Sequence, residues 1–91
     1  MIIRIATFTV SPDGRDWVTE ALRNVPGVRA AYHAIRPGVD GYISVSIHDD
    51  EAAAQRGWHA IAARREELGV IELEGPEKIE FYRVDHYIEN R

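Results

Sequence analysis

The segment YISVSIH at positions 42–48 constrains the fold more than any other stretch of this sequence. Aliphatic residues fall at every second position, and serine or histidine stands between them. Successive side chains of a β-strand point to opposite faces, so this spacing predicts an antiparallel strand that is buried on one face. One face would carry Ile43, Val45 and Ile47, and the other Ser44, Ser46 and His48.

Three more segments are typical of strands, and two are typical of helices. β-Branched and aromatic residues dominate the predicted strands, whereas apolar residues recur every three or four positions in the predicted helices. The second helix should begin among acidic residues and end before Gly69, because acids favour helix N-termini and glycine commonly terminates helices. The strands are predicted at 2–10, 28–36, 42–48 and 78–88, the helices at 15–25 and 49–68, a turn at 11–14, and either a short strand or an apolar loop at 70–77.

The resulting order, β-α-β-β-α-β, suits a single domain that spans residues 1–91. The expected class is α+β and ferredoxin-like, with an antiparallel sheet and both helices on one face. The other sheet face would then expose apolar side chains, which require a partner. We therefore predict a homodimer that packs sheet against sheet with two-fold symmetry. The apolar residues expected on that face are Ile3, Ile5, Tyr42 and either Val84 or Phe81.

Composition narrows the range of partners and cofactors. The formal net charge is −4, from 11 basic and 15 acidic residues, and this balance lacks the clustered positive charge that binds nucleic acid or anionic membranes. There is no cysteine, which excludes disulfides and thiolate metal sites. No apolar run reaches the length of a membrane span, and Arg4 interrupts the N-terminal run where a secretory leader would continue. We expect a cytoplasmic protein that binds neither nucleic acid nor membranes.

Trp58 and His59 are adjacent in the alanine-rich segment AAAQRGWHAIAARR, but they cannot form one site on a helix. Consecutive helical residues lie about 100° apart and do not share a face. Trp58 should face the sheet, either as a core residue or as the wall of a pocket, and His59 should face solvent. Arg65 should either reach the rim of the helix or meet an anionic ligand or a carboxylate. The predicted inward stripe is Ala54, Trp58, Ile61, Arg65 and Leu68.

Arginines within the predicted strands are further candidates for chemistry. Arg4 lies in the first strand and Arg83 in the last. On the face toward the helices, a guanidinium could stabilise negative charge on a substrate oxygen. The alternative is an ion pair with Glu80 or Asp85, either between strands or at the edge of a dimer.

Tyr32 or His33 could relay a proton, depending on which side of the second strand faces the helices. The remaining histidines are scattered over two strands and a helix, and none has a second ligand at the close spacing of a metal motif. We therefore predict no metal site. The four histidines are His33, His48, His59 and His86.

In their order and spacing, these segments resemble the antibiotic biosynthesis monooxygenase-like family of the dimeric α/β-barrel superfamily. The resemblance rests on ATFTVSPDG, NVPGVRAAYHAIRP, GYISVSIHDDEAAA and IEFYRV, which span most of the chain. It implies a homodimer of ferredoxin-like subunits that forms a dimeric α/β barrel, each subunit having a pocket between sheet and helices. Some members oxidise polyaromatic phenols with molecular oxygen and without metal or flavin, and a related branch degrades haem.

Transferred residue by residue, the resemblance is partial. Trp58 stands where relatives place a helix tryptophan that lines the pocket. The haem branch uses a first-strand asparagine, and here that position is Ala6 or Thr7; the segment RREELG lacks the histidine that would bind iron. Relatives also have a tryptophan near the end of the third strand, where this chain has Ile47 and His48.

The resemblance thus implies a cofactor-independent monooxygenase-like protein that binds a small aromatic or quinone-like molecule, with haem degradation disfavoured. The alternative is a non-catalytic dimeric module that binds a small ligand. The candidate substrate-binding residues are Trp58, Arg4, Phe8, Phe81 and Ile61, and the candidate catalytic residues are Arg65, Arg83, Tyr32 and His33.

Overall fold

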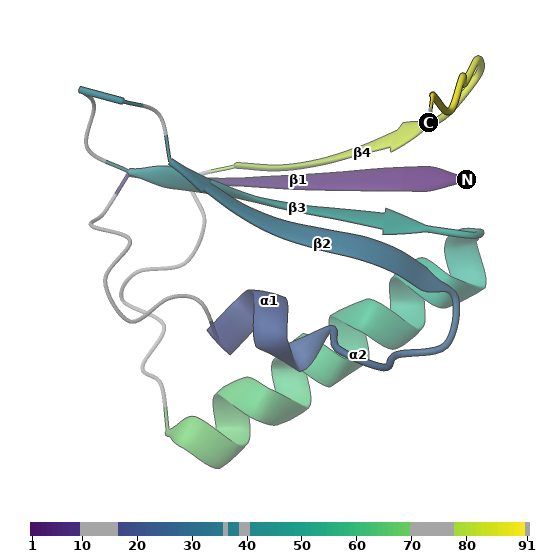
Figure 1. Ribbon diagram of the computed structural model, residues 1–91. Coiled ribbons are helices and arrows are strands. Elements are labelled where there is room, and N and C mark those ends of the chain that lie inside the picture. The colour runs from purple at the N-terminus through teal and green to yellow at the C-terminus, as the bar shows by residue number, and fades with distance from the viewer. Residues whose placement is uncertain (10–16, 36, 39–40, 70–77, 91) are drawn as a thin grey trace.

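The protein contains a four-stranded antiparallel sheet with two helices on one face (Figure 1). The computed structural model has the elements β1 (Ile2–Phe8), α1 (Trp17–Ala21), β2 (Val28–Ile35), β3 (Tyr42–His48), α2 (Glu51–Leu68) and β4 (Lys78–Arg83). The strand order is β2-β3-β1-β4. This is the predicted α+β, ferredoxin-like fold. The structure describes residues 1–9, 17–35, 37–38, 41–69 and 78–90, and the segments 11–14 and 70–77 lie outside them.

Both strands at the ends of the chain and the first helix are clearly shorter than predicted. The strand β1 ends at Phe8, and β4 ends at Arg83. The helix α1 stops before its predicted end because the residues that follow it close tight i→i−3 turns and Asn24 adopts a left-handed φ of 64°. The apolar spacing continues past the helix, so periodicity alone overestimates its length.

The helix α2 ends where the sequence indicates, and it begins two residues into the predicted segment. The Asp50 carboxylate accepts a hydrogen bond of 2.8 Å from the Ala53 amide, which satisfies one of the free N–H groups at the helix start. Gly69 has a φ of 64°, and its N–H donates to the carbonyls of Arg65 and Glu66. Local capping chemistry therefore sets both ends of this helix.

The side of β3 that faces the helices is the polar one. Ser44, Ser46 and His48 are each at most 1% exposed, whereas Ile43 is 36% exposed. The helix α2 comes so close to this side that a Cβ added at Gly57 would lie 3.0 Å from the imidazole Cε1 of His48. The absence of a side chain at Gly57 therefore lets α2 pack directly over His48.

Two residues predicted on the outer face lie on the inner one. Directly opposed residues on neighbouring strands share a face, and the register pairs Tyr42 with Phe8 and Phe81 with Arg4. The prediction for Tyr42 and Phe81 was therefore wrong, since strand register rather than hydrophobicity decides the face. The prediction is confirmed for Ile3 and Ile5. The register also places Ile43, Val45 and Ile47 on this face, where the sequence analysis had not put them.

Candidate functional site

A row of four buried polar residues crosses the inner face of the sheet. The Nε of Arg4 donates to the Oγ of Ser46 at 2.8 Å, and its Nη2 donates to the Oγ of Ser44 at 2.7 Å. The same Oγ of Ser46 lies 2.8 Å from the Nε2 of His48. We call Arg4, Ser44, Ser46 and His48 the inner-face row. The sequence placed Ser44, Ser46 and His48 on one side of a strand and Arg4 in another strand, but it gave no sign that these two sides would be buried together.

Arg4 is a buried cation whose hydrogen-bond partners are neutral. Its side chain is 5% exposed, and burial lowers the pKa of its guanidinium, which stays protonated because the ordinary pKa is so high. The predicted alternative of an ion pair with Glu80 is wrong for Arg4. Glu80 lies across from Ile5, on the outer face, where it accepts from Tyr82 and lies 3.5 Å from Lys78.

The surroundings of His48 disfavour its protonated form. Burial, and then the charge of Arg4, lower the pKa of its imidazole, while the backbone of Ala53 opposes the shift less strongly. Its Nδ1 is buried and has no hydrogen-bond partner among the described residues. Because the Ser46 hydroxyl oxygen accepts from Arg4, its own hydrogen is available for the Nε2 of His48, and this arrangement favours the proton on Nδ1.

The lowered pKa of His48 predicts a loss of stability in mild acid. An unfolded histidine takes up its proton near pH 6.5, before the folded one does. Lowering the pH through that value therefore favours the unfolded chain, and the contribution of His48 is fully present only above it. Urea unfolding from pH 8 to pH 5 should show a falling midpoint in the native protein and a flatter profile in His48→Gln. The exposed control His59→Gln should keep the native slope; equal slopes in all three proteins would contradict this assignment.

Three stacked rings lie beside the row. The rings of Phe8 and Tyr42 are 4.5 Å apart between centroids and 5° from parallel, and those of His33 and Tyr42 are 4.5 Å apart and 12° from parallel. The stack places His33 on the inner face. Tyr32 consequently lies on the outer face, across from Val45, and cannot reach the inner-face row as a proton relay. Strand alternation therefore removes Tyr32 from the candidate site.

Trp58 lies on the flank of α2 that turns away from α1. Arg56 donates to the Pro26 carbonyl at 3.0 Å, which directs the opposite flank toward the connection between α1 and β2. Trp58 follows two residues later, about 200° around the helix. Its side chain is 43% exposed, so Trp58 is not a core residue. That it forms the wall of a pocket stays a prediction. Gly57 packs closely over His48. From this geometry we infer that Trp58 is directed toward the half of the inner face formed by β1 and β4.

The other predicted site residues lie either near the inner face of β1 and β4 or in the hydrophobic core. Phe81 pairs with Arg4 on the inner face and is 55% exposed, because neither helix covers β4 (Figure 1). Arg65 lies two turns after Trp58 and is half-buried, while Arg83 is exposed. Ile61 was expected to bind substrate. It packs instead in the core against Val18 and Leu22 of the first helical segment.

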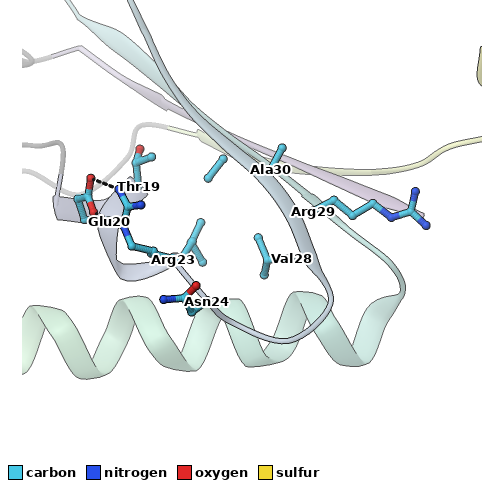
Figure 2. Close-up of a pocket in the computed structure, with 9 residues that line it drawn as sticks. Thr19, Glu20, Arg23, Asn24, Val28, Arg29 and Ala30 are labelled. Carbon is cyan, nitrogen blue, oxygen red and sulfur yellow. Dashed lines mark hydrogen bonds and ion pairs between the residues drawn. The ribbon is translucent and has the colours of Figure 1, made fainter. Parts of the chain in front are cut away.

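A pocket of about 240 Å³ opens elsewhere, between α1 and β2 (Figure 2). Glu20 and Arg23 form an ion pair of 2.8 Å at its edge, which lowers the pKa of Glu20. Figure 2 shows Arg29 pointing away from the pocket, and Arg29 binds Asp49 instead. None of the predicted site residues lines this pocket. Its walls are Thr19, Glu20, Leu22, Arg23, Asn24, Val28, Arg29, Ala30 and Ala31.

Within the described ranges, no three histidine, aspartate or glutamate side chains come close enough together to hold a metal ion. None of the helices described is long and apolar enough to cross a membrane. The described inner face thus offers a buried cation, neutral polar groups and exposed aromatic side chains.

Comparison with known proteins identifies the fold. No family model matches the chain, and no curated protein matches it by sequence. Solved structures match it over nearly its full length, and their common class is the ferredoxin-like α+β subunit. The chain shares the fold of the antibiotic biosynthesis monooxygenase proteins, the description that three of these bacterial structures carry. This confirms the fold that the sequence resemblance implied.

Three of these structures show the range within the fold. Rv0793 from Mycobacterium tuberculosis is 13% identical, with a TM-score of 0.73 and coverage of 97% of this chain and 98% of that chain. The haem degrader MhuD from the same organism, with two haems bound, is 16% identical, with a TM-score of 0.66 and coverage of 98% and 100%. The monooxygenase ActVA-Orf6 of Streptomyces coelicolor, in complex with nanaomycin D, is 21% identical, with a TM-score of 0.66 and coverage of 99% and 92%. Such identities establish the fold, and one fold supports several functions.

Proposed function

We propose that this protein is a cofactor-independent monooxygenase-like enzyme that binds a small aromatic or quinone-like molecule against the inner face of its sheet. The observation that carries the proposal is the buried Arg4, which is held by two serine hydroxyls beside the exposed aromatic ring of Phe81. A fixed positive charge in a site of low dielectric stabilises an oxyanion far better than the same charge in water. Oxygen would react directly with the electron-rich bound molecule.

In this proposal, the residues of the inner face and of α2 have separate roles. Arg4 stabilises developing negative charge, while Trp58 and Phe81 provide apolar surface for the aromatic ring. Arg65 and Arg83 stand at the margin of the same half of the sheet and would attract an anionic substrate toward it. His33, on the inner face beside Tyr42, is the remaining candidate for a proton relay.

A haem-binding function fits the described residues less well. A haem ligand would require an accessible imidazole on the inner face. His48 is buried and bonded to Ser46, and His33 is stacked against Tyr42. His59 is exposed on α2, and His86 is exposed beyond the end of β4. The second candidate function is therefore a non-catalytic dimeric module that binds the same kind of small molecule, which the polar inner face supports equally well.

Oxygen consumption separates these two functions. The purified protein should consume oxygen with at least one member of a panel of hydroquinones and anthrones. Trp58→Ala should lower kcat/KM about tenfold or more, a loss of about 1.4 kcal/mol in transition-state binding. The matched control is His59→Ala, which alters the exposed neighbour and should leave the rate unchanged. If the native protein consumes no oxygen with any member of the panel, the binding module is the better description.

We also propose that two copies pair through their outer sheet faces. The aliphatic side chains of β1 and β3 on this face have no covering layer in the described chain (Figure 1). A contiguous apolar surface of this kind marks an interaction site. A second copy would present the same surface about a two-fold axis, which makes the contact self-complementary.

A further inference from the structure

We propose that the inner-face row is an anion site, so that the molecule bound by this protein carries a negative charge which Arg4 receives. The inference rests on the proposed function for the location of the site and adds the chemical class of the ligand: an aromatic anion, such as a phenolate or the anion of a hydroxyquinone.

The hydrogen bonds of Arg4 leave capacity for such a ligand. A guanidinium has five N–H donors, and the structure assigns two of them, one to Ser46 and one to Ser44. The two bonds fix the plane of the group against β3. An oxyanion that approaches from the side of β4 would meet the remaining donors in the planar geometry that carboxylates and phenolates prefer.

The charge of Arg4 is not neutralised within the row. Both partners are hydroxyls, and at the next group, His48, burial and Arg4 itself lower the pKa and so disfavour a second cation. A buried charge without an opposite charge costs free energy that a hydrophobic residue of similar size would avoid. The row therefore has the electrostatics of a site that is complete only when a negative group is present.

The surroundings of Arg4 select an aromatic anion over a small inorganic one. Phe81 is its direct neighbour on β4 and is more than half exposed. Ile79, one position along the same side of β4, is also exposed, and Trp58 borders the same half of the sheet. A planar apolar ring could lie on these side chains while its oxyanion reaches the guanidinium.

A matched pair of probes tests the charge. 2-Hydroxy-1,4-naphthoquinone is an anion at neutral pH, and its 2-methoxy analogue has the same rings without the charge. Isothermal titration of the native protein at pH 7.5, without oxygen, should show at least about tenfold tighter binding of the anion. Arg4→Gln should abolish this preference, and Arg4→Lys should retain part of it. The control Arg23→Gln removes an exposed arginine that pairs with Glu20 at the pocket between α1 and β2, and it should keep the full preference.

Equal affinity of the native protein for the two probes, or no binding of the anion, would overturn the anion site. So would a preference that survives in Arg4→Gln. The affinities of the native protein for the two probes test the anion site even if Arg4→Gln fails to fold. Binding and turnover are separate measurements, so the two proposals can fail separately. A protein that prefers the anion and consumes no oxygen refutes only the enzymatic function, whereas oxygen consumption without the preference refutes only the anion site.

Discussion

The double variant S44A/S46A is expected to be less stable than the native protein by about 3–5 kcal/mol, as measured by urea unfolding. These two hydroxyls accept both of the hydrogen bonds that the structure assigns to Arg4. Without them, a charged group remains in a site that is almost closed to water, and its desolvation is no longer offset. The cavity left by two small hydroxyl groups contributes less than the stranded charge.

A third substitution separates the charge from the packing. Arg4→Met removes the cation and keeps most of the side-chain volume, so S44A/S46A/R4M should recover most of the lost stability. Arg4→Met alone should unfold at about the native urea concentration or above it. If the triple variant is no more stable than S44A/S46A, the hydroxyls stabilise the sheet by some means other than their bonds to Arg4.

Val45→Glu is expected to convert a native dimer into a monomer, with dimer dissociation at least about 100-fold more favourable, or roughly 2.7 kcal/mol. Val45 lies on β3, on the outer face, between Ile5 of β1 and Tyr32 of β2. A carboxylate at this place would be buried against its own copy across the two-fold axis, where neither charge has a partner. Light scattering after size exclusion measures the mass of each species directly.

The control for this experiment is His59→Glu, which adds the same charge on the exposed side of α2 and should leave the dimer intact. A native protein that elutes as a monomer across the micromolar range contradicts the proposed pairing. A dimer that persists in Val45→Glu places the contact on some other surface.

Local signals made much of the fold predictable. The alternation along β3, the acidic start of α2 and the glycine after it depend on interactions within a few residues, and the structure confirms each. The order of elements then leaves few ways to form one antiparallel sheet with both helices on one face. The elements α1 and β4 were predicted too long, because the signals in the sequence at their ends are less specific.

The candidate site was harder to predict because it depends on which sides of the strands meet the helices. Hydrophobicity favours aliphatic residues toward the helices, yet β3 turns its serines and His48 inward. On this side α2 packs closely over His48, and a Cβ added at Gly57 would lie 3.0 Å from the imidazole. Gly57 rather than Trp58 makes the close contact, one residue away from the apolar stripe that hydrophobicity predicts.

The strand order has a consequence for how the chain reaches its native state. β1 lies at the centre of the sheet, but its pairing partners come from far along the chain: Ile2 faces His48 on one side, and Thr7 faces Lys78 on the other. Contacts of such long range slow the search for the native topology. During synthesis the central strand emerges before either neighbour exists, so this stretch of isoleucines stays open to chaperones and to misassociation until the last strand arrives.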